Sequence, residues 1–236
     1  MIRIGCAGWS IASRDAALFD AGDSLLARYA TRFDAVEINS SFYKPHRATT
    51  YARWADSVPA GFRFSIKLPR TITHEARLSG CGAALDAFLE AAGGLGDKLD
   101  CVLVQLPPSL AFDARTAATF FAMLARRWPG RVACEARHAS WLTPQADALL
   151  ARHHVARVAA DPARHGNDAQ PGGSARFGYW RWHGRPKIYY SDYDAEALDA
   201  IAVAVRAGPA DAWVVFDNTA TGHAIPNAAA LQMRLR

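Results

Sequence analysis

The spacing of apolar residues along the chain switches repeatedly between two patterns, and this switching predicts alternating strands and helices. Short apolar runs bounded by polar or turn-forming residues predict strands at residues 2–7, 35–39, 62–67, 99–106, 131–135, 155–160, 177–183 and 212–217. Between most of these runs, apolar residues recur every three or four positions, which predicts helices at residues 23–33, 49–57, 82–93, 114–128, 144–153, 195–207 and 227–236.

This order of elements predicts the fold class. Strands that alternate with helices favour a parallel sheet, and eight of them in 236 residues come close to the ~250 residues typical of a closed barrel. We therefore expect an α/β fold, a (βα)8 TIM-like barrel that forms a single domain over residues 1–236. An open doubly wound sheet is the alternative, but the absence of Gly-x-Gly-x-x-Gly after the first strand disfavours a dinucleotide-binding fold.

One connection departs from the alternation of strands and helices. Residues 161–176 are rich in glycine and proline and lack helical periodicity. We expect that a loop replaces one helix of the barrel there. Structureless connections of this length commonly serve as lids or mobile segments.

The alternation of side chains along each strand predicts which polar residues point toward the barrel axis. In the second strand Glu37 and Asn39 share one face, and Val36 and Ile38 share the other. The same phase selects further polar residues late in their strands, namely Lys67, Gln105, Glu135, Arg181, His183 and Asp217. Because parallel strands of a barrel end at a single face, where barrel enzymes place their chemistry, we predict that these side chains converge on one site.

The loops that follow these strands add further polar and aromatic groups at the same face, namely Tyr43, Arg70, His74, Arg137, His138, Trp141 and Asn218. We assign catalytic roles to Glu37, Lys67, Glu135 and Asp217. We assign ligand binding to Asn39, Tyr43, Arg70, His74, Gln105, Arg137, His138, Trp141, Arg181, His183 and Asn218. Cations match or exceed anions in this set, which favours a phosphate or carboxylate ligand, although an ion-pair network closing the barrel mouth would give the same pattern.

The composition bounds the class of protein. The chain is 51% hydrophobic and 21% charged, as in soluble globular proteins, and its net charge of +5 mildly favours anionic partners. Its four cysteines form no Cys-x-x-Cys pair, so we expect small buried side chains rather than disulfides or a zinc site. No signal-peptide pattern and no apolar run of about 18 residues occurs, so we expect a cytoplasmic protein without a membrane partner.

Several motifs occur in an order that resembles the YecE-like family, also known as domain of unknown function 72. They are Gly-Cys-Ala-Gly-Trp at 5–9, Val-Glu-Ile-Asn-Ser-Ser-Phe-Tyr at 36–43, Phe-Ser-Ile-Lys-Leu-Pro-Arg at 64–70, Gln-Leu-Pro-Pro-Ser at 105–109, Glu-Ala-Arg-His-Ala-Ser-Trp at 135–141, Arg-Trp-His-Gly at 181–184 and Phe-Asp-Asn-Thr at 216–219. The resemblance covers nearly the whole chain and implies a TIM-like barrel, but it implies no established activity.

The first functional hypothesis is an enzyme that acts on a phosphorylated or otherwise anionic substrate, such as a phosphoester hydrolase. The barrel is distantly similar to those of endonuclease IV and xylose isomerase, which hold divalent metals at the strand ends. Candidate ligands here are His74, Glu135, His138, His183 and Asp217. However, no His-x-His or His-Glu-x-x-His motif occurs, so a divalent metal is conceivable but not favoured, and the cofactor is unknown.

Two further hypotheses use no metal. In the second, Glu37 and Glu135 form the acid/base pair of a hydrolase or lyase, or Lys67 forms a Schiff base if burial lowers its pKa. For Lys67 we favour simple pairing with Glu37 or Glu135. In the third, the site binds nucleic acid phosphate or a small anionic molecule without turnover. No surface pattern predicts self-association, so we expect a monomer.

Overall fold

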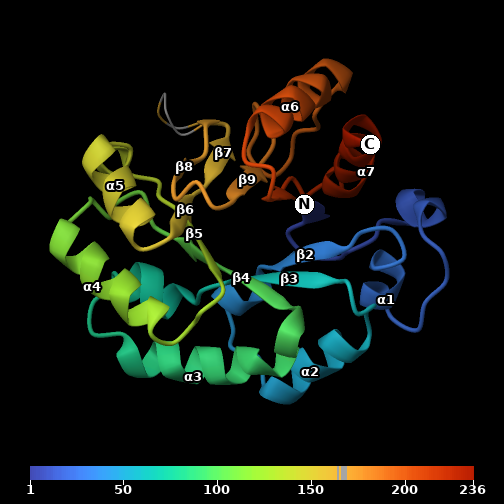
Figure 1. Cartoon of the computed structure of the whole chain (residues 1–236). Coiled ribbons are helices and arrows are strands. Elements are labelled where there is room, and N and C mark those ends of the chain that lie inside the picture. Colours follow the sequence, from blue (N-terminus) through green and yellow to red (C-terminus); the bar gives the residue numbers. More distant parts are fainter. Residues whose placement is uncertain (164, 166–168) are drawn as a thin grey trace.

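The computed structural model describes residues 1–163, 165 and 169–236, and its strands lie at the centre of the molecule (Figure 1). One sheet has the strand order β1-β10-β9-β7, and the other has the order β2-β3-β4-β5-β6-β8. The strands are β1 (Ile2–Cys6), β2 (Ala35–Ile38), β3 (Arg63–Lys67), β4 (Leu99–Gln105), β5 (Arg131–Glu135), β6 (Val155–Arg157), β7 (Ala159–Asp161), β8 (Gly172–Gly173), β9 (Gly178–Trp182) and β10 (Ala212–Phe216). Every pairing is parallel except that of β6 with β8.

The helices lie around the outside of these strands (Figure 1). They are α1 (Leu25–Tyr29), α2 (Ala48–Asp56), α3 (Gly82–Ala92), α4 (Ala114–Ala125), α5 (Pro144–Arg152), α6 (Ala195–Ala207) and α7 (Ala224–Leu235). A side-chain oxygen accepts from a backbone N–H at the first turn of four of them, where it replaces a missing intrahelical partner; these caps are Ser24, Asp113, Thr143 and Asp194.

Most predicted elements are confirmed to within one or two residues, and the exceptions lie at element ends. Helix α1 is shorter than predicted, and α7 begins at Ala224 rather than at residue 227. The predicted strand 155–160 consists of β6 and β7, which Val158 separates. Short helical turns follow β2, β3 and β5, where loops were predicted, at Ser40–Phe42, Thr71–Glu75 and Ala139–Trp141.

The glycine-rich connection at 161–176 is not structureless throughout. Its described residues contain no α-helix, as predicted, but Gly172 and Gly173 form β8 and pair with Arg157 and Ala156 of β6. Glycine allows this close approach, because a Cβ on Gly173 would lie 2.6 Å from the carbonyl oxygen of Val155. Residues 164 and 166–168 lie outside the described part, so the expectation of a lid there stays a prediction.

Two links connect the sheets. Between β1 and β2, the Ala7–Glu37 bridge is completed by a hydrogen bond from Gly8 N to Glu37 O at 2.9 Å. On the other side, residues 155–161 run without a break from β6, which pairs with β5, into β7, which pairs with β9. The chain is therefore a mixed α/β fold of parallel sheets, consistent with a TIM-like fold.

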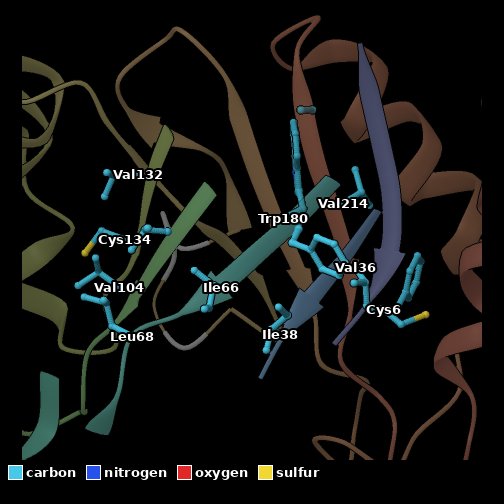
Figure 2. Close-up of a cluster of buried hydrophobic side chains, with 14 of the residues drawn as sticks. Cys6, Val36, Ile38, Ile66, Leu68, Val104, Val132, Cys134, Trp180 and Val214 are labelled. Carbon is cyan, nitrogen blue, oxygen red and sulfur yellow. The ribbon is translucent and has the colours of Figure 1, made fainter. Parts of the chain in front are cut away.

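Buried apolar side chains form two separate clusters on the two faces of the strands. The inner cluster consists of Ala35, Cys101, Leu103, Ala133, Ala156, Val158, Phe177, Tyr179, Trp213 and Val215. The outer cluster lies between strands and helices, and Figure 2 shows part of it, including Cys6, Val36, Ile38, Ile66, Leu68, Val104, Val132, Cys134, Trp180 and Val214. Where a strand contributes to both clusters, the two sets take alternate positions along it. In β2, Ala35 belongs to the inner cluster and Val36 and Ile38 to the outer one, so the predicted phase of Val36 and Ile38 is confirmed.

The cysteines follow the same pattern of burial. All four are free thiols and buried, as predicted for small apolar side chains. Burial raises the pKa of the Cys6 thiol to about 12, so this group stays protonated.

No helix in the described part of the chain combines the length and the apolar character that crossing a bilayer requires.

Candidate functional site

Buried charged residues occupy the last inward position of several strands, next to the inner cluster. This charged cluster contains four cationic side chains and three carboxylates: Lys67, Arg137, Arg181 and His183, and Glu37, Glu135 and Asp217. Glu37 follows Ala35 in phase, Glu135 follows Ala133, and Asp217 follows Val215. Strand phase therefore brings the cluster together at the C-terminal ends of the strands.

The guanidinium of Arg181 lies at the centre of this cluster and is fully buried. It binds Glu37 in a bidentate manner, with Nη2 2.7 Å from Oε1 and Nε 3.0 Å from Oε2. Nη1 donates to Glu135 Oε2 at 2.6 Å, and Nη2 also donates to Asp217 Oδ2 at 2.8 Å. Burial opposes the charge of Arg181, but the three carboxylates outweigh burial and raise the pKa of the guanidinium well above its usual range.

Two more cations complete the pairing of Glu135 and Asp217. Arg137 donates from Nε and Nη2 to Glu135 Oε1, at 2.9 and 2.8 Å. His183 lies between the carboxylates, with Nδ1 3.0 Å from Asp217 Oδ2 and Nε2 3.3 Å from Glu135 Oε1. Against the effect of burial, Arg137, Arg181 and His183 lower the pKa of Glu135, and Arg181 and His183 lower that of Asp217. The two carboxylates in turn raise the pKa of His183 and so favour the cationic imidazole.

Lys67 does not form the pair with Glu37 or Glu135 that the sequence led us to favour, and that expectation is wrong. Among the described residues, no carboxylate oxygen lies within 4.0 Å of its ammonium group, because Arg181 already binds both glutamates. The Lys67 Nζ lies instead 4.2 Å from the centre of the Phe42 ring, and the residue is only 6% exposed. Burial, together with the charge of Arg181, lowers the pKa of Lys67 to about 8, although the carboxylates oppose the shift.

Two tyrosines belong to the site although neither was predicted as a site residue. The Tyr179 hydroxyl lies 2.9 Å from Glu37 Oε2 and 2.8 Å from Ser65 Oγ, so it links the inner cluster to the carboxylate. Its phase, which it shares with Arg181, would have identified it. Tyr189 contributes, with Glu135, to raising the pKa of Arg137 against the effect of burial, but it lies in an irregular segment that carries no periodic signal.

Three predicted ligand-binding residues lie at the rim around Lys67. The His74 ring packs edge-on against Phe42 at 4.9 Å; burial lowers its pKa, and nearby Lys67 and Arg137 lower it further. Tyr43 is 75% exposed and packs edge-on against Phe42, with 4.9 Å between the ring centres. Arg70 is largely exposed and pairs with Glu75 at 3.1 Å.

The predicted amide residues lie close to the strand ends but in different settings. Gln105 is buried opposite Glu135 in the register of β4 and β5. The Asn39 Oδ1 atom is buried and has no hydrogen-bond partner in the described part of the chain, which leaves an acceptor for a ligand donor. Asn218 Nδ2 donates to Ser191 O at 3.0 Å and to Asn227 Oδ1 at 2.8 Å, so it braces neighbouring segments.

Two predicted ligand-binding residues have other contacts. Trp141 belongs to the outer cluster, where it is 1% exposed, donates from Nε1 to Leu110 O at 2.9 Å and packs on Phe112. His138 accepts from Ser140 N through Nδ1 at 3.2 Å and so caps the short turn after β5. Sequence position alone could not separate packing and capping from ligand contact in that loop.

A cavity of about 600 Å³ lies at the opposite, N-terminal ends of the strands. Arg131 contributes to its wall but is already paired with Asp100 at 2.6 Å and with Asp211. The N-terminal ends of barrel strands generally serve stability, whereas chemistry lies at the C-terminal ends. We therefore place the candidate site at the charged cluster rather than in this cavity.

The arrangement of the carboxylates bears on metal binding. The described residues include no group of three or more His, Cys, Asp or Glu side chains placed to hold a metal ion. All three carboxylates of the charged cluster accept hydrogen bonds from Arg181, so the guanidinium already compensates their negative charge. The groups of the site that could still bind a ligand are thus its cations, above all Lys67.

Comparisons with known proteins agree with one another. The family model described as "Protein of unknown function DUF72" matches residues 3–236. The UPF0759 protein YecE of Escherichia coli is 32% identical over 107 residues, which are 45% of this chain and 38% of that protein. The UPF0759 protein YunF of Bacillus subtilis is 28% identical over 152 residues, 61% of this chain and 53% of that protein.

A solved structure extends the likeness to the whole fold. A DUF72 family protein from Enterococcus faecalis superposes with a TM-score of 0.85 at 23% identity, covering 100% of this chain and 95% of that one. At this identity the likeness shows the fold alone. The matched segments of YecE and YunF span only about a third to a half of those relatives, 38% and 53% respectively.

Proposed function

This chain belongs to the DUF72 family of proteins of unknown function, and from that premise we propose that it is an enzyme acting on a small anionic substrate at the C-terminal ends of its strands. One observation carries the proposal. The charged cluster holds four cationic side chains and only three carboxylates, so it has room for one more negative charge. A buried excess of positive charge is costly unless an anion compensates it.

The burial of the cations favours a small ligand over nucleic acid. Arg181, His183 and Lys67 are 0%, 4% and 6% exposed. Proteins contact the phosphate backbone of nucleic acids mainly through accessible Arg and Lys side chains, and a duplex could not follow these groups inward. A phosphoester hydrolase is not supported in particular, because its chemistry generally relies on metal ligands that the carboxylates here are not free to provide.

We also infer that the two sheets form a single eight-stranded barrel in one domain over residues 1–236. In this count β6 and β7 are one strand, and the short antiparallel β8 is left out. The bridge between Ala7 and Glu37 and the continuous run of β6 into β7 support closure at both seams. The position of the charged cluster supports it as well, because Glu37 comes from one sheet and Arg181 from the other. A closed barrel gathers all these strand ends around one mouth.

Binding of simple anions tests the proposed function. Isothermal titration with inorganic phosphate and with oxalate should give saturable binding that weakens as salt is raised. Arg137→Gln, which keeps a donor toward Glu135 but removes the charge, should weaken binding at least tenfold. The matched control is Arg53→Gln, which removes one charge from an exposed position on α2 and should bind like the unaltered protein. The proposal fails if neither anion binds, or if both folded variants bind equally well.

A further inference from the structure

We propose that Lys67 is a nucleophile that forms an imine with the carbonyl carbon of an anionic 2-oxo compound bound in the charged cluster. The inference rests on the proposed function for the binding of the anionic group, and it adds the class of substrate and the reacting atom. It starts from the placement of Lys67, at the last position of β3 and in phase with Ser65.

The surroundings of Lys67 differ from those of a structural lysine. A buried lysine that serves stability generally pairs with a carboxylate, because an unpaired ammonium is costly to bury. Here the carboxylates of Glu37, Glu135 and Asp217 are bound to Arg181, and the ammonium of Lys67 lies over the Phe42 ring. Each of these three carboxylates is thus already paired with another cation.

This placement also makes the amine available. The pKa of Lys67 is lowered to about 8, so a useful fraction of the side chain is the neutral, nucleophilic amine near neutral pH. An exposed lysine has a pKa of about 10.4 and is almost fully protonated there. The aromatic face of Phe42 shields the amine on one side without competing for its lone pair through a hydrogen bond.

The nearby cations fit a carboxylate next to the reacting carbonyl. Arg137 uses Nε and Nη2 for Glu135, and it lies close enough to Lys67 for both charges to lower the pKa of His74. A carboxylate that binds between these cations would place an adjacent carbonyl beside the Lys67 amine. The anionic group and the reactive carbon therefore belong to one small molecule, a 2-oxo acid.

The covalent step balances without an oxidant or a metal. The neutral Lys67 nitrogen adds to the carbonyl carbon, and the carbonyl oxygen takes a proton to become a hydroxyl group. The nitrogen loses its first proton, and its second proton is balanced by the one that the hydroxyl takes up to leave as water when the carbon–nitrogen double bond forms. One carbon–oxygen double bond is exchanged for one carbon–nitrogen double bond, and one water molecule is released.

Reductive trapping tests this proposal directly. The full chain is incubated with pyruvate and sodium cyanoborohydride, which delivers hydride to the imine carbon while water supplies the proton to nitrogen. Intact mass spectrometry should show a single reduced adduct per chain, and peptide mapping should place it on Lys67. The other lysines, Lys44, Lys98 and Lys187, serve as internal controls. Adducts spread over these lysines, or none at all, would overturn the inference.

A matched variant separates this inference from the proposed function. Lys67→Arg keeps the positive charge but lacks the nucleophilic amine, so it should lose the adduct, and any oxalate binding that it retains shows that its site is still formed. If oxalate binds but pyruvate is never trapped, the imine fails and anion binding stands. If the neutral aldehyde propanal is trapped on Lys67 as fast as pyruvate and no anion binds, then the imine stands and the anionic substrate fails.

Discussion

At the scale of single residues, the site depends on how one guanidinium divides its donors among three carboxylates. Arg181 contacts Glu37, Glu135 and Asp217 in surroundings without solvent, where an unpaired charge costs several kcal/mol. The same allocation leaves Lys67 without a carboxylate partner. The pKa of Lys67 is therefore lowered in part because Arg181 takes the carboxylates that could have paired with the lysine.

Replacing the central cation tests this allocation. Arg181→Met should lower the free energy of unfolding by about 3–5 kcal/mol at pH 7, because it leaves three buried carboxylates without their partner. The loss should shrink as the pH falls from 7 to 5, since unpaired buried carboxylates have raised pKa values and take up protons on folding. Urea unfolding followed by circular dichroism measures both effects. A variant as stable as the original at pH 7 would contradict the role given to Arg181.

Replacing Lys67 should have the opposite effect on stability. The pKa of this residue falls from 10.5 to about 8, so the protein disfavours its charged form. Lys67→Met removes the charge and keeps the packing against Phe42, and it should raise the free energy of unfolding at pH 7 by about 1–3 kcal/mol. Oxalate binding should weaken in the same variant. Thermal and urea unfolding provide the check, and a clear loss of stability would mean that the ammonium has a stabilising partner.

His183 should give stability a distinct pH dependence. Its pKa is raised above 6.5 by Glu135 and Asp217, so its contribution is complete below pH 6.5 and is lost as the pH rises through the raised value. The difference in unfolding free energy between the original protein and His183→Gln should therefore decrease from pH 6 toward pH 8.5. Urea titrations at closely spaced pH values measure this difference, and a difference that does not change with pH would refute the assignment.

At the scale of elements, the seam between β1 and β2 depends on a side chain rather than on a full ladder of backbone hydrogen bonds. The Tyr29 hydroxyl, carried by α1, accepts from Cys6 N at 2.9 Å and donates to Ala35 O at 3.0 Å. It thereby satisfies one backbone group of each strand inside the core. Gly5 lies at the same seam, where a Cβ would be 2.1 Å from Ala35 O.

Tyr29→Phe tests this seam. The change leaves two buried backbone groups without a partner and should cost about 1–3 kcal/mol of unfolding free energy. The matched control is Tyr51→Phe, because the Tyr51 hydroxyl is buried without a hydrogen-bond partner in the described part of the chain, so its removal should be neutral or stabilising. Urea unfolding of both variants measures the two changes. Equal losses of unfolding free energy would show that the hydrogen bonds of the Tyr29 hydroxyl do not stabilise the seam.

The elements also show how far sequence patterns reach. Apolar periodicity predicted the strands well because several of them, such as β4 and β10, bury one face in the inner cluster and the other in the outer cluster, so alternate positions carry separate signals. Phase then identified the residues of the charged cluster. The missed features depend on particular contacts: β8 on the fit of Gly173 against Val155, and Tyr189 on a segment without periodicity. The pairing of Lys67 was mistaken because phase does not tell which of two cations takes a carboxylate.

At the scale of the whole molecule, the charged cluster joins both sheets, so we expect them to unfold together. Ellipticity in the far ultraviolet and tryptophan fluorescence should give coincident urea transitions with a single midpoint. Three of the seven tryptophans lie in β9 and β10, and the other four lie in α2 and in connecting segments elsewhere in the chain, so fluorescence reports on several parts of the fold. Two separated transitions would contradict both the closed barrel and the single domain.

The contacts of Arg181 also have a consequence for the synthesis of the chain. Its partners Glu37 and Glu135 precede it by 144 and 46 residues, and Asp217 follows it by 36 residues. During translation the first two acidic groups leave the ribosome before their counter-ion exists, so the early strands cannot bury them and have to remain hydrated. The central ion pairs can therefore form only after Asp217, the last of these four residues, has been synthesised.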